Sequence, residues 1–152
     1  MKRKSLQGDM CPIARSLDVI GDWWSLLIVR DALLGARRFS QFQKNLGVAK
    51  NILTVRLRTL VAEGILEMKR PSVGGAHLDY VPTAKARGLF PVLVALRQWG
   101  EEFVIQPGET FTALVDRQNG LPLRKLQICA QDGRLLDQAD TKIAVPGMSP
   151  VA

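Results

Sequence analysis

The sequence predicts a mainly α-helical fold with one β-hairpin, followed by a small β-rich appendage at the C-terminal end. Three observations support this prediction. Apolar residues recur at helical spacing over residues 11–63, alternate with a period of about two over residues 65–81, and return to helical spacing over residues 83–103. A Pro-Gly pair then interrupts the pattern. We therefore place one domain at residues 1–107 and a C-terminal extension at residues 108–152.

Two helices are predicted within residues 11–34. The first has its apolar residues at helical spacing between Ile13 and Ile20, and the second begins after Asp22, a favourable N-cap. The second helix holds more bulky apolar residues than one face can carry. It is therefore expected either at the centre of the core or sharing a second face with another subunit.

A short helix and a longer one follow. Ser40 is predicted as the N-cap of the short helix, and Gly47 as the residue at which it ends. The longer helix is predicted over residues 49–63, because apolar residues lie there at helical spacing and leave a basic, polar side. Its apolar residues are Ile52, Leu53, Val55 or Arg56, Leu57, Leu60 and Val61.

The next segments predict the hairpin and a further helix. Residues 65–81 alternate on both sides of the turn PSVGG, which predicts two antiparallel strands. Thr83 is predicted to cap a helix that runs to about Phe103. Pro91 lies inside this helix and removes one backbone donor, so it predicts either a kink or a late helix start.

In the C-terminal extension, three short strands are predicted from the segments FTALVD, LRKLQICA and KIAVP. Asn119-Gly120 and Asp132-Gly133 separate them, and both pairs favour hairpin turns.

The basic residues are concentrated in the first half of the chain. The formal net charge is +7, of which residues 1–80 carry +6 and residues 81–152 carry +1. This asymmetry predicts a surface that binds a polyanion, most commonly nucleic acid, with an anionic membrane surface as the alternative.

Other features exclude several classes of protein. The two cysteines form no CxxC pair, so we expect neither a disulfide framework nor a zinc site, and a reducing cytoplasm is the natural location. No apolar run approaches the roughly 18 residues that a membrane span needs. The single histidine and the absence of catalytic motifs argue against an enzyme, and no cofactor is expected.

Two helices joined by a tight turn, with a hairpin after the second, follow the order of a winged helix-turn-helix. A helix fits the DNA major groove, where Asn can pair with adenine, Arg or Lys with guanine, and Thr can touch a thymine methyl. A merely solvated helix face, or a module that binds RNA or protein, is the alternative. The candidate contacts are Arg37, Arg38, Ser40, Gln41, Lys50, Asn51, Thr54, Arg56, Arg58, Lys69, Arg70 and His77.

The run from Cys11 to about Phe103 resembles the HxlR-type family of winged helix-turn-helix transcriptional regulators. Four segments carry the resemblance in one order: CPIARSLDVIGDWWSLLIVRDALLGARRFSQFQ, GVAKNILTVRLRTLVAEGIL, DYVPTAKARGL and PVLVALRQWGEEF. It covers about two thirds of the chain. It implies a cytoplasmic homodimer that binds a palindromic operator on double-stranded DNA, and we expect a repressor.

There is also a physical reason to expect a dimer, because one helix-turn-helix makes too few contacts for specific DNA binding. Leu93, Leu96, Trp99 and Phe103 are the candidate interface, since together they exceed what so small a domain can easily bury. The alternative is that they cover the core of their own subunit.

Cys11 precedes Pro12 at the start of the first predicted helix, a position that favours a reactive thiol. The resemblance implies a role in sensing oxidants or electrophiles, as in some relatives. A small buried cysteine without such a role, or control by a non-covalent small-molecule ligand, is the alternative. The extension is similar to a metal-binding ribbon in some members, but it has only Cys129 and no matching histidine, so no metal is expected.

Overall fold

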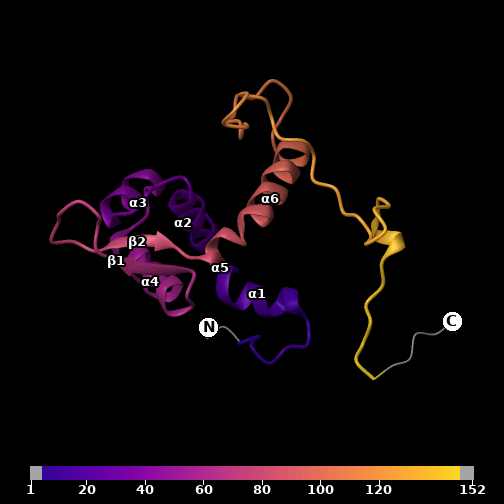
Figure 1. The fold of residues 1–152 in the computed structure, drawn as a ribbon, viewed down its shortest axis with the longest axis horizontal. Helices are drawn as coiled ribbons and strands as arrows, with labels where there is room; N and C mark the ends of the chain where they lie inside the picture. Colours follow the sequence, from indigo (N-terminus) through magenta and orange to yellow (C-terminus); the bar gives the residue numbers. More distant parts are fainter. Residues whose placement is uncertain (1–4, 148–152) are drawn as a thin grey trace. The chain divides into compact units, whose positions relative to one another are not determined.

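The computed structural model describes residues 5–147, and it confirms the mainly helical fold with one hairpin (Figure 1). The described residues fall into two compact units, with the boundary between Leu96 and Arg97. The domain boundary placed at residue 107 stays a prediction. The elements are α1 (Pro12–Ile20), α2 (Trp23–Leu33), α3 (Phe39–Leu46), α4 (Lys50–Ala62), β1 (Leu66–Lys69), β2 (Asp79–Pro82), α5 (Ala84–Arg87), α6 (Phe90–Phe103) and the 3₁₀ helix η1 (Gln138–Asp140).

Asp22 begins α2, as predicted. Its carboxylate accepts a hydrogen bond from the Ser25 backbone N–H at 3.0 Å and another from the Ser25 hydroxyl. The first bond satisfies an amide that the start of a helix otherwise leaves unpaired. The same carboxylate lies 3.2 Å from the Arg56 guanidinium of α4. One side chain therefore both caps α2 and ties it to α4.

The prediction that Ser40 caps α3 is wrong. The helix begins at Phe39 with Arg38 in the cap position, and the exposed Ser40 lies inside its first turn. The physical reason is the side chain of Gln41, whose Oε1 accepts from the backbone N–H groups of Arg37, at 2.8 Å, and Arg38, at 2.9 Å. Gln41 in the first turn thus reaches back to the two amides that precede the helix, as the third helical residue of a capping box does.

Gly47 ends α3 as predicted, with φ of 61° in the left-handed region that favours glycine. Its N–H donates to the Gln43 carbonyl at 2.9 Å. The helix α4 begins three residues later, at Lys50, so the helix-turn-helix is tight. A residue with a side chain at position 47 would strain this turn, because the φ of 61° favours glycine.

The core of the first unit lies between α2, α3, α4 and the hairpin. Leu53, Leu57 and Leu60 of α4 are buried, as predicted. Placing Ile52 on the apolar face was wrong, because its side chain is 39% exposed. Of the alternatives Val55 and Arg56, Arg56 is the half-buried residue, and Val55 is 55% exposed. The three leucines at spacings of four and three already define one face of the helix, and Ile52 and Val55 fall outside it.

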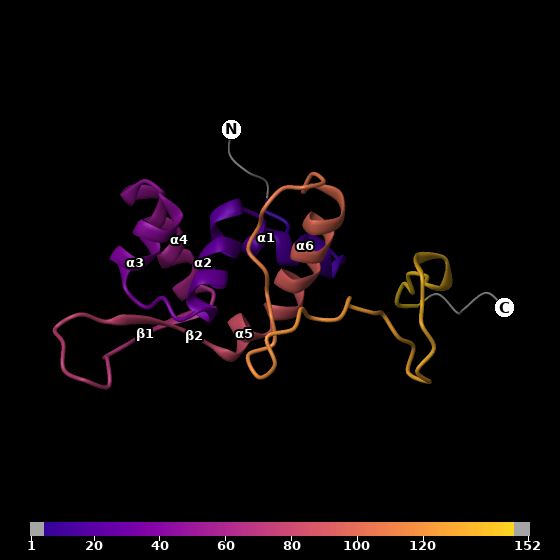
Figure 2. The same ribbon diagram turned by 90° about the horizontal axis from the view of Figure 1, so that it is seen from above.

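The hairpin pairs β1 with β2 in antiparallel register, with Leu66 opposite Pro82 and Lys69 opposite Asp79. Residues 70–78 connect the strands in a loop that extends away from the helices of this unit (Figure 2). The Tyr80 ring meets the edge of Phe42 at a centroid distance of 6.3 Å. This contact holds the hairpin against α3.

The single helix predicted from Thr83 to about Phe103 is two helices, α5 and α6. Thr83 caps α5, since its hydroxyl oxygen accepts from the Ala86 N–H at 3.4 Å. Pro91 is the second residue of α6, where its missing N–H costs nothing. Of the two outcomes that Pro91 predicted, the late helix start is confirmed.

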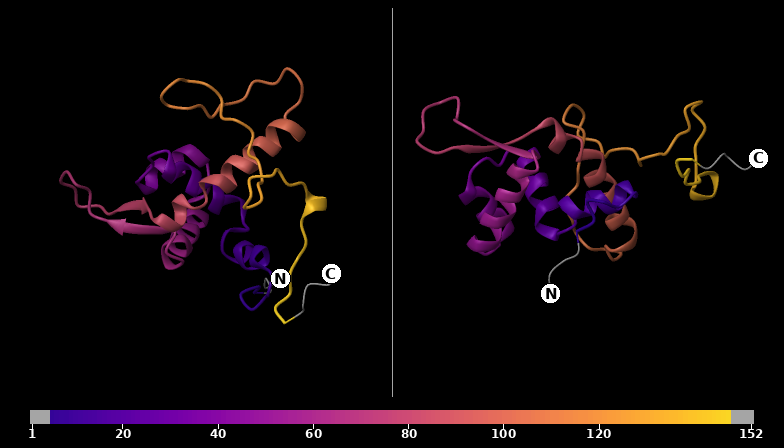
Figure 3. Two further views of the ribbon diagram at one scale, coloured as in Figure 1. Left: turned by 45° about the vertical axis from the view of Figure 1, so that its right-hand side comes forward. Right: turned by 90° about the horizontal axis from the view of Figure 1, so that it is seen from below.

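The three strands predicted in the C-terminal extension are not formed in residues 108–147 (Figure 3). Antiparallel pairing there is limited to the isolated bridges Val115–Pro122 and Cys129–Leu135, one at each predicted turn. Most of these residues are exposed, and short strands without a packed layer behind them are not stable. Hydrogen bonds from the Arg134 side chain and backbone lower the pKa of Asp132 at the second turn.

Candidate nucleic-acid interface

The outward face of α4 carries a stripe of three exposed residues, Asn51, Val55 and Arg58. Their spacings of four and three place them along one side of the helix, opposite the buried leucines. Lys50 is exposed in the first turn of α4. Within residues 5–147, the side chains of Lys50 and Arg58 form no ion pair. They are therefore available to an anionic partner.

Two other candidates on α4 have partners within the protein. The Thr54 hydroxyl donates to the Lys50 carbonyl at 2.8 Å, and the Arg56 Nε lies 3.2 Å from the Asp22 carboxylate. Both side chains are half-buried. Their first role is to stabilise α4 and its packing on α2, and their contact with DNA stays a prediction.

The four candidates just before α3 and in its first turn also differ in their contacts. Arg37 donates to the carbonyls of Ala32, at 2.6 Å, and Ala36, at 2.8 Å, so it closes the end of α2. Arg38 is exposed, with its Nε 3.9 Å from the Asp79 carboxylate of β2. Gln41 uses its side-chain oxygen to cap α3. Arg38, Ser40 and Gln41 are exposed, whereas Arg37 is half-buried.

The wing candidates Lys69, Arg70 and His77 are all exposed. Lys69 pairs with Glu67 at 2.7 Å, whereas Arg70 has no ion pair in the described part of the chain. A loop of this kind can lie along the phosphate backbone or in the minor groove beside a helix in the major groove.

Sequence reasoning missed Val55 as a surface residue of α4. The signal that finds it is the leucine spacing, because Leu53, Leu57 and Leu60 together place the buried side of the helix about opposite residue 55. Lys44 of α3 was also missed, and it adds a further exposed cation to the helix-turn-helix.

The four predicted interface residues on α6 differ in exposure. Leu93 is half-buried and packs against the core of its own unit. Leu96, Trp99 and Phe103 are exposed, and the rings of Trp99 and Phe103 lie 5.9 Å apart. Exposed aromatic residues in this density mark a surface suited to a further contact.

Cys11 is the N-cap residue of α1, directly before Pro12 at its first position. Its side chain is exposed, and its backbone N–H donates to the Asp9 carboxylate at 2.8 Å. Cys129 is also an exposed free thiol, in the C-terminal extension. A solvent-exposed thiol at a helix N-terminus is accessible to oxidants.

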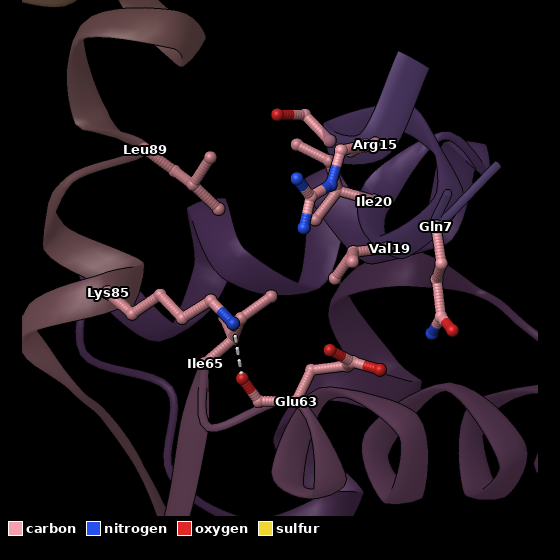
Figure 4. A pocket seen from close by; sticks show the side chains of 9 residues that line it. Gln7, Arg15, Val19, Ile20, Glu63, Ile65, Lys85 and Leu89 are labelled. Carbon is pink, nitrogen blue, oxygen red and sulfur yellow. Dashed lines mark hydrogen bonds between the residues drawn. The ribbon is translucent and has the colours of Figure 1, made fainter. Parts of the chain in front are cut away.

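A cavity of about 590 Å³ lies between α1, the end of α4 and α5 (Figure 4). Its floor includes the buried side chains of Ile20 and Ile65. The Arg15 guanidinium points into it, and the Lys85 ammonium at its side donates to the Glu63 carbonyl at 2.6 Å. The lining residues are Gln7, Arg15, Ser16, Val19, Ile20, Glu63, Ile65, Lys85 and Leu89.

No group of three or more His, Cys, Asp or Glu side chains within residues 5–147 is arranged to hold a metal ion. None of the helices described has the length and apolar character needed to cross a membrane.

Comparison with known proteins places the chain in a family. Residues 19–107 match the HxlR-like helix-turn-helix family. An uncharacterized HTH-type transcriptional regulator of Mycobacterium tuberculosis is 39% identical over 95 residues, which cover 62% of this chain and 60% of that protein. The match thus spans less than two thirds of that relative's length.

Two solved structures are similar over larger shares of their own length. The candidate transcription factor PA1607 is 50% identical, with 91% of this chain and 97% of that chain covered and a TM-score of 0.87. The redox regulator HypR in its oxidized form is 29% identical, with 63% and 100% covered and a TM-score of 0.56. The chain belongs to the HxlR-like helix-turn-helix family of transcriptional regulators.

Proposed function

We propose that the protein is a dimeric, sequence-specific DNA-binding repressor. The observation that carries this proposal is the outward stripe of α4, with Asn51 and Arg58 exposed on the side opposite the core. Amide and guanidinium groups are the side chains that read base edges in the major groove. Repression requires only that the bound protein occupies a promoter, so it needs no surface beyond the one that contacts DNA.

The exposed face of α6 supports the dimer. Leu96, Trp99 and Phe103 together present an apolar surface that a second copy would cover. Two copies related by a twofold axis place their α4 helices on successive major grooves, about 10 base pairs apart. The operator should then be an inverted repeat with that half-site spacing.

Selection of bound fragments from random DNA tests both proposals. We expect an inverted repeat bound with at least roughly 1,000-fold preference over random duplex, with affinity that falls steeply as salt rises. Single-stranded RNA should not compete. Equal affinity for operator and random duplex would contradict a sequence-specific regulator, and effective competition by RNA would favour an RNA-binding module instead.

Cys11 is the proposed sensor of oxidants. Its thiolate attacks a hydroperoxide, the O–O bond breaks, and the products are the Cys11 sulfenic acid and an alcohol or water. The exposed position at the start of α1 supports this role, as does the likeness to HypR, which is described as a redox regulator.

Treatment with cumene hydroperoxide should lower operator affinity in the wild-type protein and leave Cys11→Ser unaffected. Cys129→Ser is the matched control, because it also replaces an exposed thiol, and it should respond like wild type. Dithiothreitol should restore binding. A response that survives Cys11→Ser and disappears in Cys129→Ser would assign sensing to Cys129 and overturn the role proposed for Cys11.

The cavity beside α1 favours a second mode of control, by a small organic anion with an apolar body. Arg15 supplies a cation without an ion pair in the described range, and the floor of the cavity is apolar. Because Glu63 and Ile65 join α4 to the wing, a ligand there contacts the DNA-binding elements directly. Control by a ligand and by Cys11 are alternatives for the same regulator.

Thermal unfolding with benzoate as the probe tests the cavity. We expect the unfolding temperature to rise saturably with benzoate at millimolar concentration in the wild type and in Arg117→Ala, and not in Arg15→Ala. Arg117 is an exposed arginine of the C-terminal extension, so its loss changes the charge equally. Equal shifts in all three proteins would show a general salt effect and overturn the ligand site.

A further inference from the structure

Within the described part of the chain, Val55 of α4 is not one of the residues that pack against the hydrophobic core. Its side chain is 55% exposed, between Asn51 and Arg58 on the outward stripe. A β-branched residue is a poorer helix former than alanine or most polar residues, so helix stability does not account for it. Single exposed apolar residues are common on protein surfaces. This one, however, lies at the centre of the surface that carries the proposed function.

The major groove offers one apolar group, the C5 methyl of thymine. The other base edges there present hydrogen-bond donors and acceptors, which a valine cannot satisfy and whose burial against it would cost free energy. An isopropyl group therefore favours thymine, and the contact with the C5 methyl is what separates thymine from cytosine.

The spacing on α4 limits where this thymine can be. Asn51 and Arg58 are seven residues apart, which is about 10 Å along a helix. Successive base pairs are about 3.4 Å apart, so the stripe covers roughly three base-pair steps. Val55 lies between the two polar residues and projects from the same side of the helix.

We propose that Val55 is a specificity-determining residue, and that in each half-site it contacts the methyl group of a thymine lying between the base pairs contacted by Asn51 and Arg58. The proposal rests on the proposed DNA-binding function. It assigns no base to Ile52, which lies to one side of the stripe and is 39% exposed.

Replacing thymine with uracil removes only the methyl group, so it isolates this contact. In the selected operator, each thymine of a half-site is replaced by uracil in turn, in both half-sites together. Affinity is measured for wild type, Val55→Ala and the control Val145→Ala, whose valine is exposed in the C-terminal extension. Alanine on an exposed helix position preserves the fold.

At one thymine position, uracil should weaken binding of wild type and Val145→Ala by roughly threefold or more per half-site, the effect of exposing one methyl group. In Val55→Ala the same change should cost less than about twofold, because the partner is already lost. A wild type indifferent to uracil at every position, or an equal loss in Val55→Ala, would overturn the assignment while leaving the regulator intact. Failure to select any operator would instead overturn the proposed function, and the assignment with it.

Discussion

Replacing Arg58 with alanine should weaken binding of the protein to its selected operator by roughly 10- to 100-fold, the loss expected when one good base contact is removed. Arg58 is exposed on the outward stripe of α4, and it forms no ion pair among the residues described. Its guanidinium has no hydrogen-bond or ion-pair partner within residues 5–147, so we expect the fold not to depend on it. Far-ultraviolet circular dichroism and the unfolding temperature should therefore match those of wild type, and the loss should appear in a DNA titration alone.

Arg117→Ala is the matched control for this experiment, because it removes the same charge from an exposed site outside the helix-turn-helix. It should change operator affinity by less than about twofold. If Arg58→Ala weakens operator and random duplex by the same factor, Arg58 contacts phosphate and not a base. If it weakens neither, α4 is not the recognition helix.

Replacing Phe42 with alanine should lower the free energy of unfolding by about 3–5 kcal/mol, the usual cost of truncating a buried phenylalanine. Phe42 is fully buried in α3 and meets the ring of Tyr80 from the hairpin. Its loss leaves a cavity between the helix-turn-helix and the wing. Because domains are stable by only about 5–15 kcal/mol, this variant should unfold at a much lower urea concentration.

Phe111→Ala is the comparison for the core variant. Phe111 is exposed in the C-terminal extension, so its truncation should cost less than about 1 kcal/mol. Urea unfolding followed by circular dichroism measures both. A loss below about 1 kcal/mol for Phe42→Ala would mean that the hairpin does not pack on α3 as described.

Local signals were sufficient to predict the order and type of the elements up to residue 82, and that Thr83 begins a helix. Asp22 and Thr83 are caps and Gly47 is a left-handed helix end, and each acts on amides or carbonyls within a few residues of itself. Pro91 lies in the first turn of α6 because its ring fixes φ and it has no N–H to donate, and both are properties of the residue itself. Interactions of such short range depend only on residues that are close in the sequence, so their positions can be predicted without knowing the fold.

The side chains of the candidate interface were harder to predict, because their partners are distant. Arg56 lies beside Asp22 at the start of α2, and Arg38 lies 3.9 Å from Asp79 of β2. Both have the same residue type as Arg58, which is accessible on the outward face. A basic residue predicts a possible anion contact, but whether its charge is already neutralised depends on what packs beside it.

The sequence by itself therefore determined the helix-turn-helix, the hairpin and the basic character of their surface, since periodicity, caps and composition are local properties. The tertiary structure alone decided that Arg56 pairs with Asp22, that Arg38 lies beside Asp79, and that the segments after residue 108 form only isolated β bridges. The physical reason is the same in each case. Burial, hydrogen-bond partners and strand pairing are set by which neighbours are present in space, and alternation without a layer to pack on does not make a sheet.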